Sequence, residues 1–133
     1  MVDASAVVAF FLREEGWERL SRYMFRTASV GHVVKEFYNS VWRAVRGRKL
    51  TPEEAGEMVS MFKRYLDKCL EITSEERLVD RALEIALESG ATVYDALYIA
   101  PALNKGKPLL TLDKKTEIAE KYGVATLPRH RQL

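Results

Sequence analysis

The stretch Gly106-Lys107-Pro108-Leu109-Leu110-Thr111-Leu112-Asp113 decides the fold class of this chain. Its apolar part is short, follows a glycine and a proline, and ends at Asp113, so it predicts a buried strand. One helical pattern precedes it, from Val93 to about Asn104, and another follows it at 118–122. A buried strand between two helices is the repeating unit of a parallel sheet.

The rest of the chain continues this alternation. Short apolar segments at the start of the chain, at 70–72 and at 124–127 lie between helical patterns, and the clearest helix start is the capping box Thr51-Pro52-Glu53-Glu54. Ser5 is the expected N-cap of the first helix. The sequence therefore predicts an α/β fold, a three-layer α/β/α sandwich whose mostly parallel sheet has about five strands.

Composition limits the class of protein. The 133 residues, 47% of them apolar, suffice for one domain covering 1–133, and the one cysteine, Cys69, excludes an internal disulfide framework. No apolar run reaches the roughly 18 residues of a membrane span, and no secretory leader is recognisable, so we expect a cytoplasmic protein. Amides are scarce and charged residues are plentiful, which is typical of proteins from hot environments.

Four of the nineteen acidic residues fit poorly with a solvated helix face. Asp3 and Asp113 each follow a predicted strand, at the sheet edge where open α/β folds bind ligands. Asp95 lies in the first turn of a helix that begins at the same edge, although an acid there can simply complement the helix dipole. Glu36 lies early in the third helix, on its polar stripe.

Carboxylates that converge at one edge repel one another unless a cation lies between them. Oxygen ligands without histidine or cysteine favour Mg²⁺ or Mn²⁺ over zinc. His32 and His130 lack the spacing of metal ligands, and Cys69 occupies an apolar helical position. We therefore expect Mg²⁺ or Mn²⁺ as the cofactor of this site.

Four motifs resemble those of PIN-domain nucleases, and in particular the small VapC-like toxins of toxin–antitoxin pairs. They are Met1-Val2-Asp3-Ala4-Ser5, Glu36-x-x-Asn39, Val93-Tyr94-Asp95-Ala96-Leu97-Tyr98 and Leu110-Thr111-Leu112-Asp113. The resemblance covers nearly the whole chain, in the family's order and spacing. It implies a parallel α/β/α sandwich, cleavage of RNA with Mg²⁺ or Mn²⁺, a homodimer and a possible antitoxin partner.

By this resemblance the catalytic and metal-binding residues are Asp3, Glu36, Asp95 and Asp113. The supporting polar groups are Ser5, Asn39 and Thr111. Two features depart from the family pattern. Only two residues precede Asp3, so either the first strand is stunted or the native start lies upstream, and Pro101 should kink or break the helix that carries Asp95.

Basic residues form two clusters against an almost balanced net charge of +2. The first cluster, the candidate contact to the RNA backbone, comprises Arg43, Arg46, Arg48 and Lys49. The second, at 129–131, is the alternative RNA path. The amphipathic helix at 52–68, with Tyr65, Trp42 and Phe37, offers apolar surface for a homodimer.

Two other functions remain open. A phosphoryl-transfer domain also has an aspartate after its first strand. The haloacid-dehalogenase-like type needs a second acid two residues on, where this chain has Ser5, and the receiver type needs paired acids at the first strand, which are absent. A non-catalytic binding or scaffold domain on the same fold is the alternative outside enzymes. Metal binding would separate the nuclease from the scaffold.

Overall fold

The computed structural model describes residues 1–113 and 115–128. Its α-helices are α1 (Ala4–Leu12), α2 (Trp17–Leu20), α3 (His32–Arg46), α4 (Pro52–Lys68), α5 (Val79–Ser89), α6 (Val93–Lys105) and α7 (Lys115–Lys121). Two 3-10 helices, η1 (Ser21–Tyr23) and η2 (Glu75–Arg77), join them. The strands are β1 (Thr27–Val30), β2 (Leu70–Thr73), β3 (Leu109–Leu110) and β4 (Thr126–Leu127).

The strands form two parallel pairs that Val2 joins. β1 pairs with β2, and β3 pairs with β4. Val2 forms a parallel bridge with Leu110 and donates its N–H to the carbonyl of Ala28 at 2.8 Å. The segment before α1 therefore lies between β1 and β3, which gives the order β2, β1, Val2, β3, β4.

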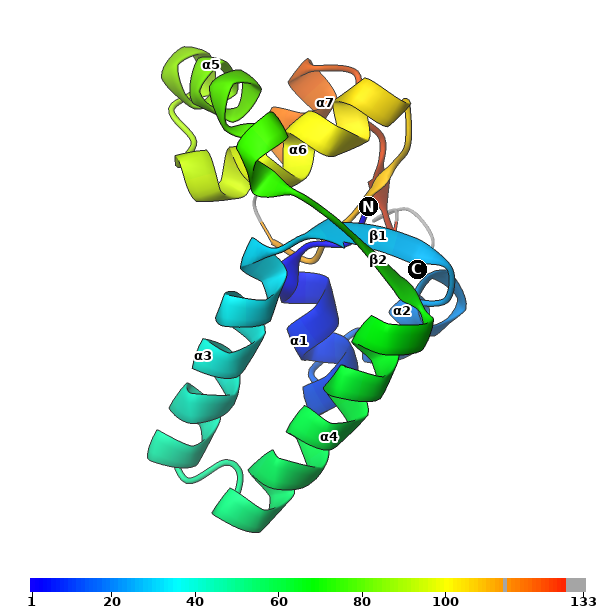
Figure 1. Ribbon diagram of the computed structural model, residues 1–133, viewed down its shortest axis with the longest axis vertical. Coiled ribbons are helices and arrows are strands. Elements are labelled where there is room, and N and C mark those ends of the chain that lie inside the picture. Colours follow the sequence, from blue (N-terminus) through cyan, green and yellow to red (C-terminus); the bar gives the residue numbers. More distant parts are fainter. Residues whose placement is uncertain (114, 129–133) are drawn as a thin grey trace.

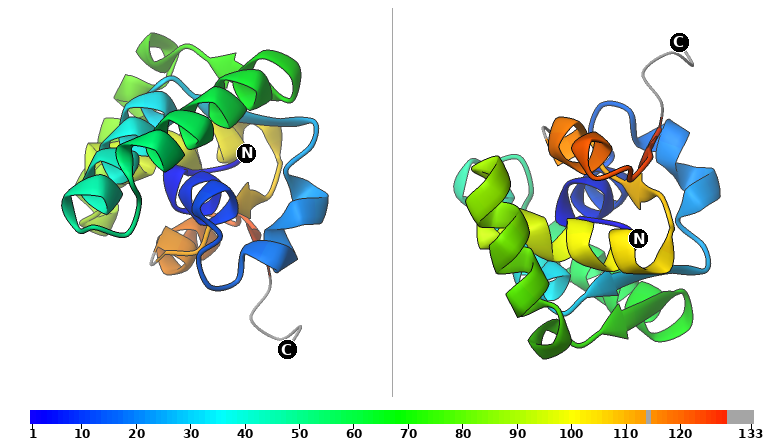
Figure 2. Two further views of the ribbon diagram at one scale, coloured as in Figure 1. Left: turned by 90° about the horizontal axis from the view of Figure 1, so that it is seen from below. Right: turned by 90° about the horizontal axis from the view of Figure 1, so that it is seen from above.

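Helices cover this layer of strands on both sides. In Figure 1, α1, α3 and α4 extend below the strands, whereas α5, α6 and α7 lie above them. The two views of Figure 2, from below and from above, show α4 across one side and α5 and α6 across the other. This arrangement confirms the α/β class and its three layers. Within the described residues no helix is long and apolar enough to cross a membrane.

The number of strands is smaller than predicted, four in the described residues instead of about five. The predicted first strand is reduced to the bridge at Val2, because helix α1 begins directly after Asp3. The strand β1, at Thr27–Val30, was not predicted from the sequence. The expected N-cap Ser5 is also wrong. Asp3 caps the helix, with an extended backbone and a carboxylate that accepts the Ala6 N–H at 3.0 Å.

Two other helix predictions have different outcomes. The capping box at Thr51 is complete, because the Thr51 and Glu54 side chains each accept the other residue's backbone N–H. Pro101, in contrast, does not break α6, which runs to Lys105. Every residue from Ala96 to Ala102 is buried, and this packing outweighs the roughly 3 kcal/mol that an interior proline costs.

The core contains the aromatic side chains that were expected to supply a dimer surface. Phe37 is fully buried and stacks on Phe62 with ring centroids 3.9 Å apart, and Tyr65 packs edge-on against Phe11. Of the three aromatic residues assigned to a dimer surface, only Trp42 is exposed, at 55%. The prediction that Phe37 and Tyr65 offer free apolar surface is therefore wrong, because they fill the space between α1, α3 and α4.

Candidate active site

A pocket of about 440 Å³ lies at the carboxyl ends of the central strands. Three of the four predicted acids line it, namely Glu36 from α3, Asp95 from the start of α6 and Asp113 after β3. Its wall also includes Ser5 of α1. The parallel sheet explains this placement, because the residues that follow parallel strands all lie at the same edge of the sheet.

Asp3 lies buried beside this pocket. Its side chain has no exposed surface, and both carboxylate oxygens accept hydrogen bonds. Oδ1 accepts from the Ser5 hydroxyl at 2.7 Å and from the Ala6 N–H at 3.0 Å, and Oδ2 accepts from the Thr111 hydroxyl at 2.5 Å. A buried carboxylate requires such donors, since water no longer solvates it. Asp3 is thus fixed by α1 and by the strand that follows β3.

Thr111 and Ser5 connect Asp3 to Asp113. The two hydroxyl oxygens lie 3.2 Å apart, and the Thr111 hydroxyl is 3.3 Å from Asp113 Oδ1. The Ser5 hydroxyl also accepts the Leu112 N–H at 2.9 Å. The two residues expected to support the acids therefore form a polar network that holds the end of β3 against the start of α1.

Glu36 is held by a different pair of residues. The Tyr98 hydroxyl donates to Glu36 Oε1 at 2.5 Å, and His32 Nε2 lies 3.2 Å from the same oxygen. The His32 ring stacks on Tyr94 with centroids 4.7 Å apart. Burial, followed by the hydrogen bond to Glu36, raises the pKa of Tyr98 well above its usual range. The phenol therefore remains protonated and continues to donate at neutral pH.

Sequence reasoning missed these two partners of Glu36. His32 precedes Glu36 by four residues, a spacing that brings side chains together on one helix face and could have revealed the contact. Tyr98 had no such signal, because it reaches Glu36 from another helix. Asn39, which was expected to support the acids, is exposed and does not line the pocket, whereas the next residue, Ser40, does.

The donor atoms around the pocket are oxygens. The three predicted acids supply carboxylates, and so do Glu14 and Glu15. Ser5 and Ser40 add hydroxyl groups. These are hard oxygen donors that suit Mg²⁺ or Mn²⁺. Within the described residues no three His, Cys, Asp or Glu side chains already have the spacing of a metal site. The donors fit in kind, and binding an ion requires side-chain movement to bring them closer together.

The first basic cluster lies away from this pocket. Arg43 and Arg46 are exposed along α3, in the turns beyond Glu36, and Arg46 lies over the Trp42 ring at 5.3 Å. Arg48 and Lys49 are exposed in the turn after the helix. The second cluster, at 129–131, lies outside the described residues.

Comparison with known proteins gives concordant results. A family model for the PIN domain matches residues 1–122. The chain is 33% identical to Ribonuclease VapC3 of Pyrobaculum aerophilum over 132 residues, which cover 96% of this chain and 98% of that protein. It is 28% identical to Exonuclease VapC9 of the same organism, covering 86% of this chain and 80% of that protein.

A solved structure agrees with the fold. The crystal structure of PAE2754 from Pyrobaculum aerophilum superimposes with a TM-score of 0.70, covering 95% of this chain and 81% of that chain. The sequence identity is 23%, so the similarity concerns the fold alone.

Proposed function

The chain belongs to the PIN-domain family, and from this membership and its pocket we propose that it is a metal-dependent ribonuclease that hydrolyses RNA phosphodiester bonds. We further propose that it is the toxin of a toxin–antitoxin pair, as the 33% identity to Ribonuclease VapC3 suggests. The observation that carries the nuclease proposal is the meeting of Glu36, Asp95 and Asp113 at one pocket, with Asp3 buried beside it.

We assign the metal ligands to this set of acids. Asp3, Asp95 and Asp113 would hold Mg²⁺ or Mn²⁺, with Glu36 as a further ligand or as the group that orients the attacking water. A divalent ion in this position supplies Lewis-acid polarisation of a phosphodiester. Ser5 and Thr111 keep the Asp3 carboxylate in one orientation, because each donates to a different oxygen of that group.

Glu36 is held in a fixed orientation at the pocket wall. Its Oε1 accepts a hydrogen bond from the Tyr98 hydroxyl and lies near His32. These two contacts fix the orientation of the carboxylate. Glu36 also lines the pocket, so it can reach a water molecule there. In this proposal Glu36 takes the proton of the attacking water, and Tyr98 and His32 only position it.

RNA would reach the pocket along α3. Arg43 and Arg46 extend from the same helix as Glu36, and Arg48 and Lys49 follow it, so all four can bind phosphates on one side of the cleavage position. Contacts of this kind give affinity without sequence preference. The protein partners that we propose are an antitoxin and a second copy of this chain.

The decisive test is cleavage of a fluorescent RNA with Mn²⁺, run beside an EDTA control and the Asp95→Asn variant. We expect cleavage that requires both the metal and Asp95. Calorimetric titration with Mn²⁺ separates the alternatives: a scaffold domain would neither bind the ion at the acids nor cleave. Cleavage that persists in EDTA, or in Asp95→Asn, would reject this assignment of the site.

A further inference from the structure

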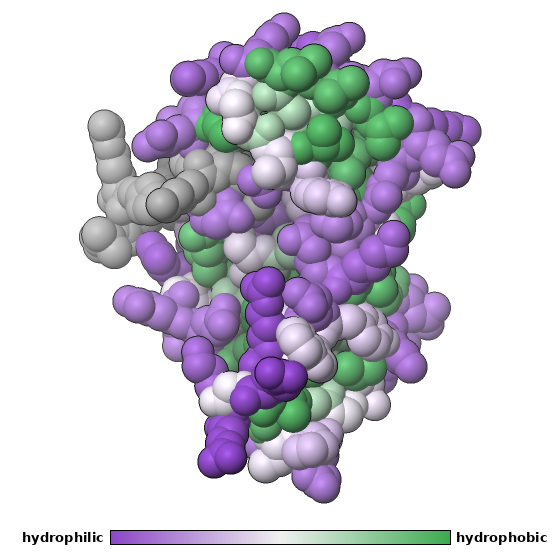
Figure 3. All heavy atoms as spheres, turned by 90° about the vertical axis from the view of Figure 1, so that its left-hand side faces the viewer, coloured by the Kyte–Doolittle hydropathy of each residue, from purple (hydrophilic) through white to green (hydrophobic). Residues whose placement is uncertain are grey.

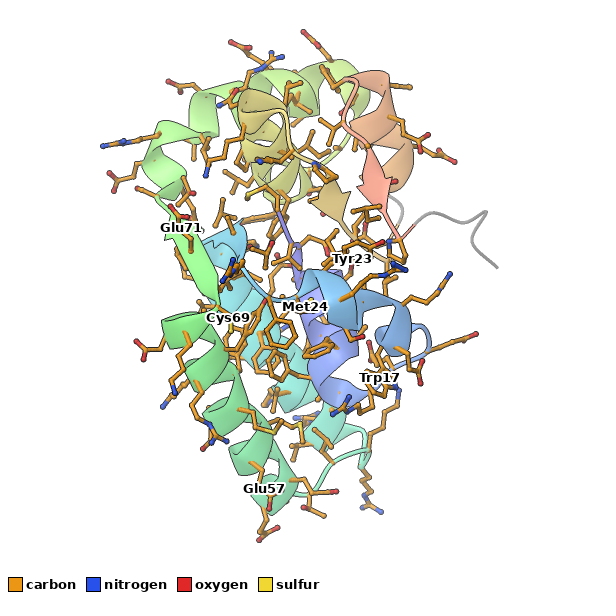
Figure 4. The ribbon with its side chains drawn as sticks, turned by 90° about the vertical axis from the view of Figure 1, so that its right-hand side faces the viewer. Trp17, Tyr23, Met24, Glu57, Cys69 and Glu71 are labelled. Carbon is orange, nitrogen blue, oxygen red and sulfur yellow. The ribbon has the colours of Figure 1, made fainter. Side chains whose placement is uncertain are left out.

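A second pocket is larger than the acidic one. It measures about 530 Å³ and lies at the opposite edge of the sheet, where β1 and β2 begin with Thr27 and Leu70. Figure 4 faces this side and shows Cys69 and Glu71, two of its lining residues, where α4 passes into β2. A volume of this size lies within the range of small-molecule sites.

The lining of this second pocket is predominantly cationic. Its lining contains four basic residues, Arg26, Lys68, Lys105 and Lys107, and two acids, Asp67 and Glu71. The basic residues come from three separate parts of the chain: the turn before β1, the end of α4 and the end of α6. Within the described residues none of the four forms a salt bridge. The fold thus gathers positive charge that its own acids do not neutralise.

Two further features concern the basic residues of this pocket. Lys105 and Lys107 lie close enough to the Met1 ammonium that, after burial, their charges are the next causes of its lowered pKa. Arg26 has a left-handed backbone with φ of 56°, a conformation that arginine rarely adopts and that glycine or asparagine would adopt more easily. Arg26 therefore occupies a backbone position at which glycine would be less strained.

We propose that this cationic pocket binds a small phosphorylated ligand of nucleotide size, carrying two or more phosphate groups. Converging cations match the geometry of a compact polyanion, because several of them can contact the same phosphates. A nucleic acid strand would instead follow a continuous basic stripe, whereas these four residues line one concavity. The ligand would not touch the acids of the proposed active site, since the two pockets share no lining residue.

The chain contains its own reporter for this site. Cys69 is its one cysteine, is partly exposed and lines the pocket. A bound ligand should therefore slow alkylation of the Cys69 thiol. Pyrophosphate and ADP are suitable probes, and calorimetry on the same samples measures their affinity.

We expect both probes to bind and to protect Cys69, and the Lys105→Gln/Lys107→Gln double variant to bind at least about tenfold more weakly, the loss of about one charged contact. The matched control, Lys63→Gln/Lys121→Gln, removes the same charge from exposed positions outside the pocket and should bind like the parent. Equal binding by the two double variants, or no protection at millimolar ligand, would overturn the proposal.

A second comparison tests Arg26. Arg26→Gly should fold at least as stably, because glycine accepts the left-handed backbone, yet it should bind ADP more weakly. Arg13→Gly is its control, since Arg13 has a similar φ of 55° but does not line the pocket. A single-stranded RNA that protects Cys69 better than ADP would assign the pocket to the RNA backbone and overturn the small-ligand proposal.

Discussion

The Tyr98 hydroxyl donates a hydrogen bond to Glu36 Oε1 at 2.5 Å, across the space between α6 and α3. Tyr98 is 1% exposed, so its ring is fixed by the core, and Glu36 at the pocket wall depends on it for its orientation. The contact links the helix that carries Asp95 to the helix that carries Glu36. It therefore sets the relative position of two proposed active-site acids.

Replacing Tyr98 with phenylalanine should reduce the rate of Mn²⁺-dependent RNA cleavage by roughly 10-fold or more, the expected cost of a mispositioned catalytic group. The protein should fold, because the ring and its packing remain. The matched control is Tyr122→Phe, which removes a hydrogen bond of the same length to Glu88 on the surface. We expect Tyr122→Phe to cleave at the parent rate, and equal losses in both variants would contradict a positioning role for Tyr98.

A second prediction concerns the ion itself. Mn²⁺ should raise the melting temperature of the parent protein, because it binds only the folded form. Asp95→Asn should weaken this rise and leave the metal-free protein about as stable, since a first-turn acid contributes only about 0.3–1 kcal/mol. Asp80→Asn is the control, because Asp80 occupies the first turn of α5 outside the pocket. An unchanged metal response in Asp95→Asn would remove Asp95 from the site.

Local signals in the sequence predicted much of this fold. The capping box at Thr51 and the helical pattern from Val93 place the starts of α4 and α6 correctly, because each is a local signal. The first strand could not be predicted in the same way. Whether Val2 forms a full ladder depends on its neighbours Ala28 and Leu110, which lie far away in the sequence.

The same distinction applies to the candidate site. The places of Asp3, Asp95 and Asp113 follow from strand ends and a helix start, which are local patterns. The bond from Tyr98 to Glu36 joins residues 62 positions apart, so no spacing rule could reveal it. The assignment of Phe37 to a dimer surface was also wrong. An aromatic residue on an amphipathic helix does not indicate whether the core of its own chain or a partner covers it.

Stability should fall at alkaline pH. Burial raises the pKa of Tyr65 and of Tyr98 above the ordinary value of 10.0. Below pH 10 both phenols are neutral in the folded and unfolded chains, so their ionisation does not change the free energy of unfolding. Above it the unfolded chain ionises first, so the free energy of unfolding decreases by up to about 1.4 kcal/mol per pH unit for each tyrosine.

Urea denaturation between pH 8 and about pH 11 would measure this slope. Tyr65→Phe should flatten it and cost little at neutral pH, because the Tyr65 hydroxyl is buried without a hydrogen-bond partner among the described residues. Tyr23→Phe, at a partly exposed tyrosine, serves as the control and should retain the slope of the parent. A parent protein whose stability does not change over this range would show that neither phenol is protected from ionisation.

Association is predicted to involve α5. Val79, Leu83 and Leu87 recur at four-residue spacing and are 40%, 48% and 78% exposed. Figure 3 faces the left-hand side of Figure 1 and shows hydrophobic side chains gathered on its upper part, in the region of α5. An exposed apolar patch of this kind is typical of association surfaces, and the commonest homo-oligomer is a symmetric dimer.

Sedimentation at micromolar concentration should therefore give about twice the chain mass of 15.2 kDa. Leu83→Glu should give monomers, because a charge on the patch loses its water in the dimer. Met61→Glu, at a 37% exposed position of α4, should remain dimeric. A monomeric parent protein would refute the homodimer, and a dimer unaffected by Leu83→Glu would place the interface elsewhere.

The last prediction concerns the first basic cluster. Replacing Arg43 and Arg46 with glutamine should weaken RNA binding about equally for unrelated sequences, because phosphate contacts carry no base information. The slope of log affinity against log salt should become shallower by roughly one unit for each lost phosphate contact. Mn²⁺ affinity should be unchanged, since neither arginine lines the acidic pocket.

Arg77→Gln/Arg81→Gln is the matched control for this experiment, because it removes the same charge from exposed or half-exposed positions beside and within α5. Its salt dependence should equal that of the parent protein. If instead the Arg43→Gln/Arg46→Gln variant keeps the slope of the parent and still cleaves, the cluster is a solvated helix face. The RNA must then follow another path, and the basic residues at 129–131, beyond the described part of the chain, would be the next to replace.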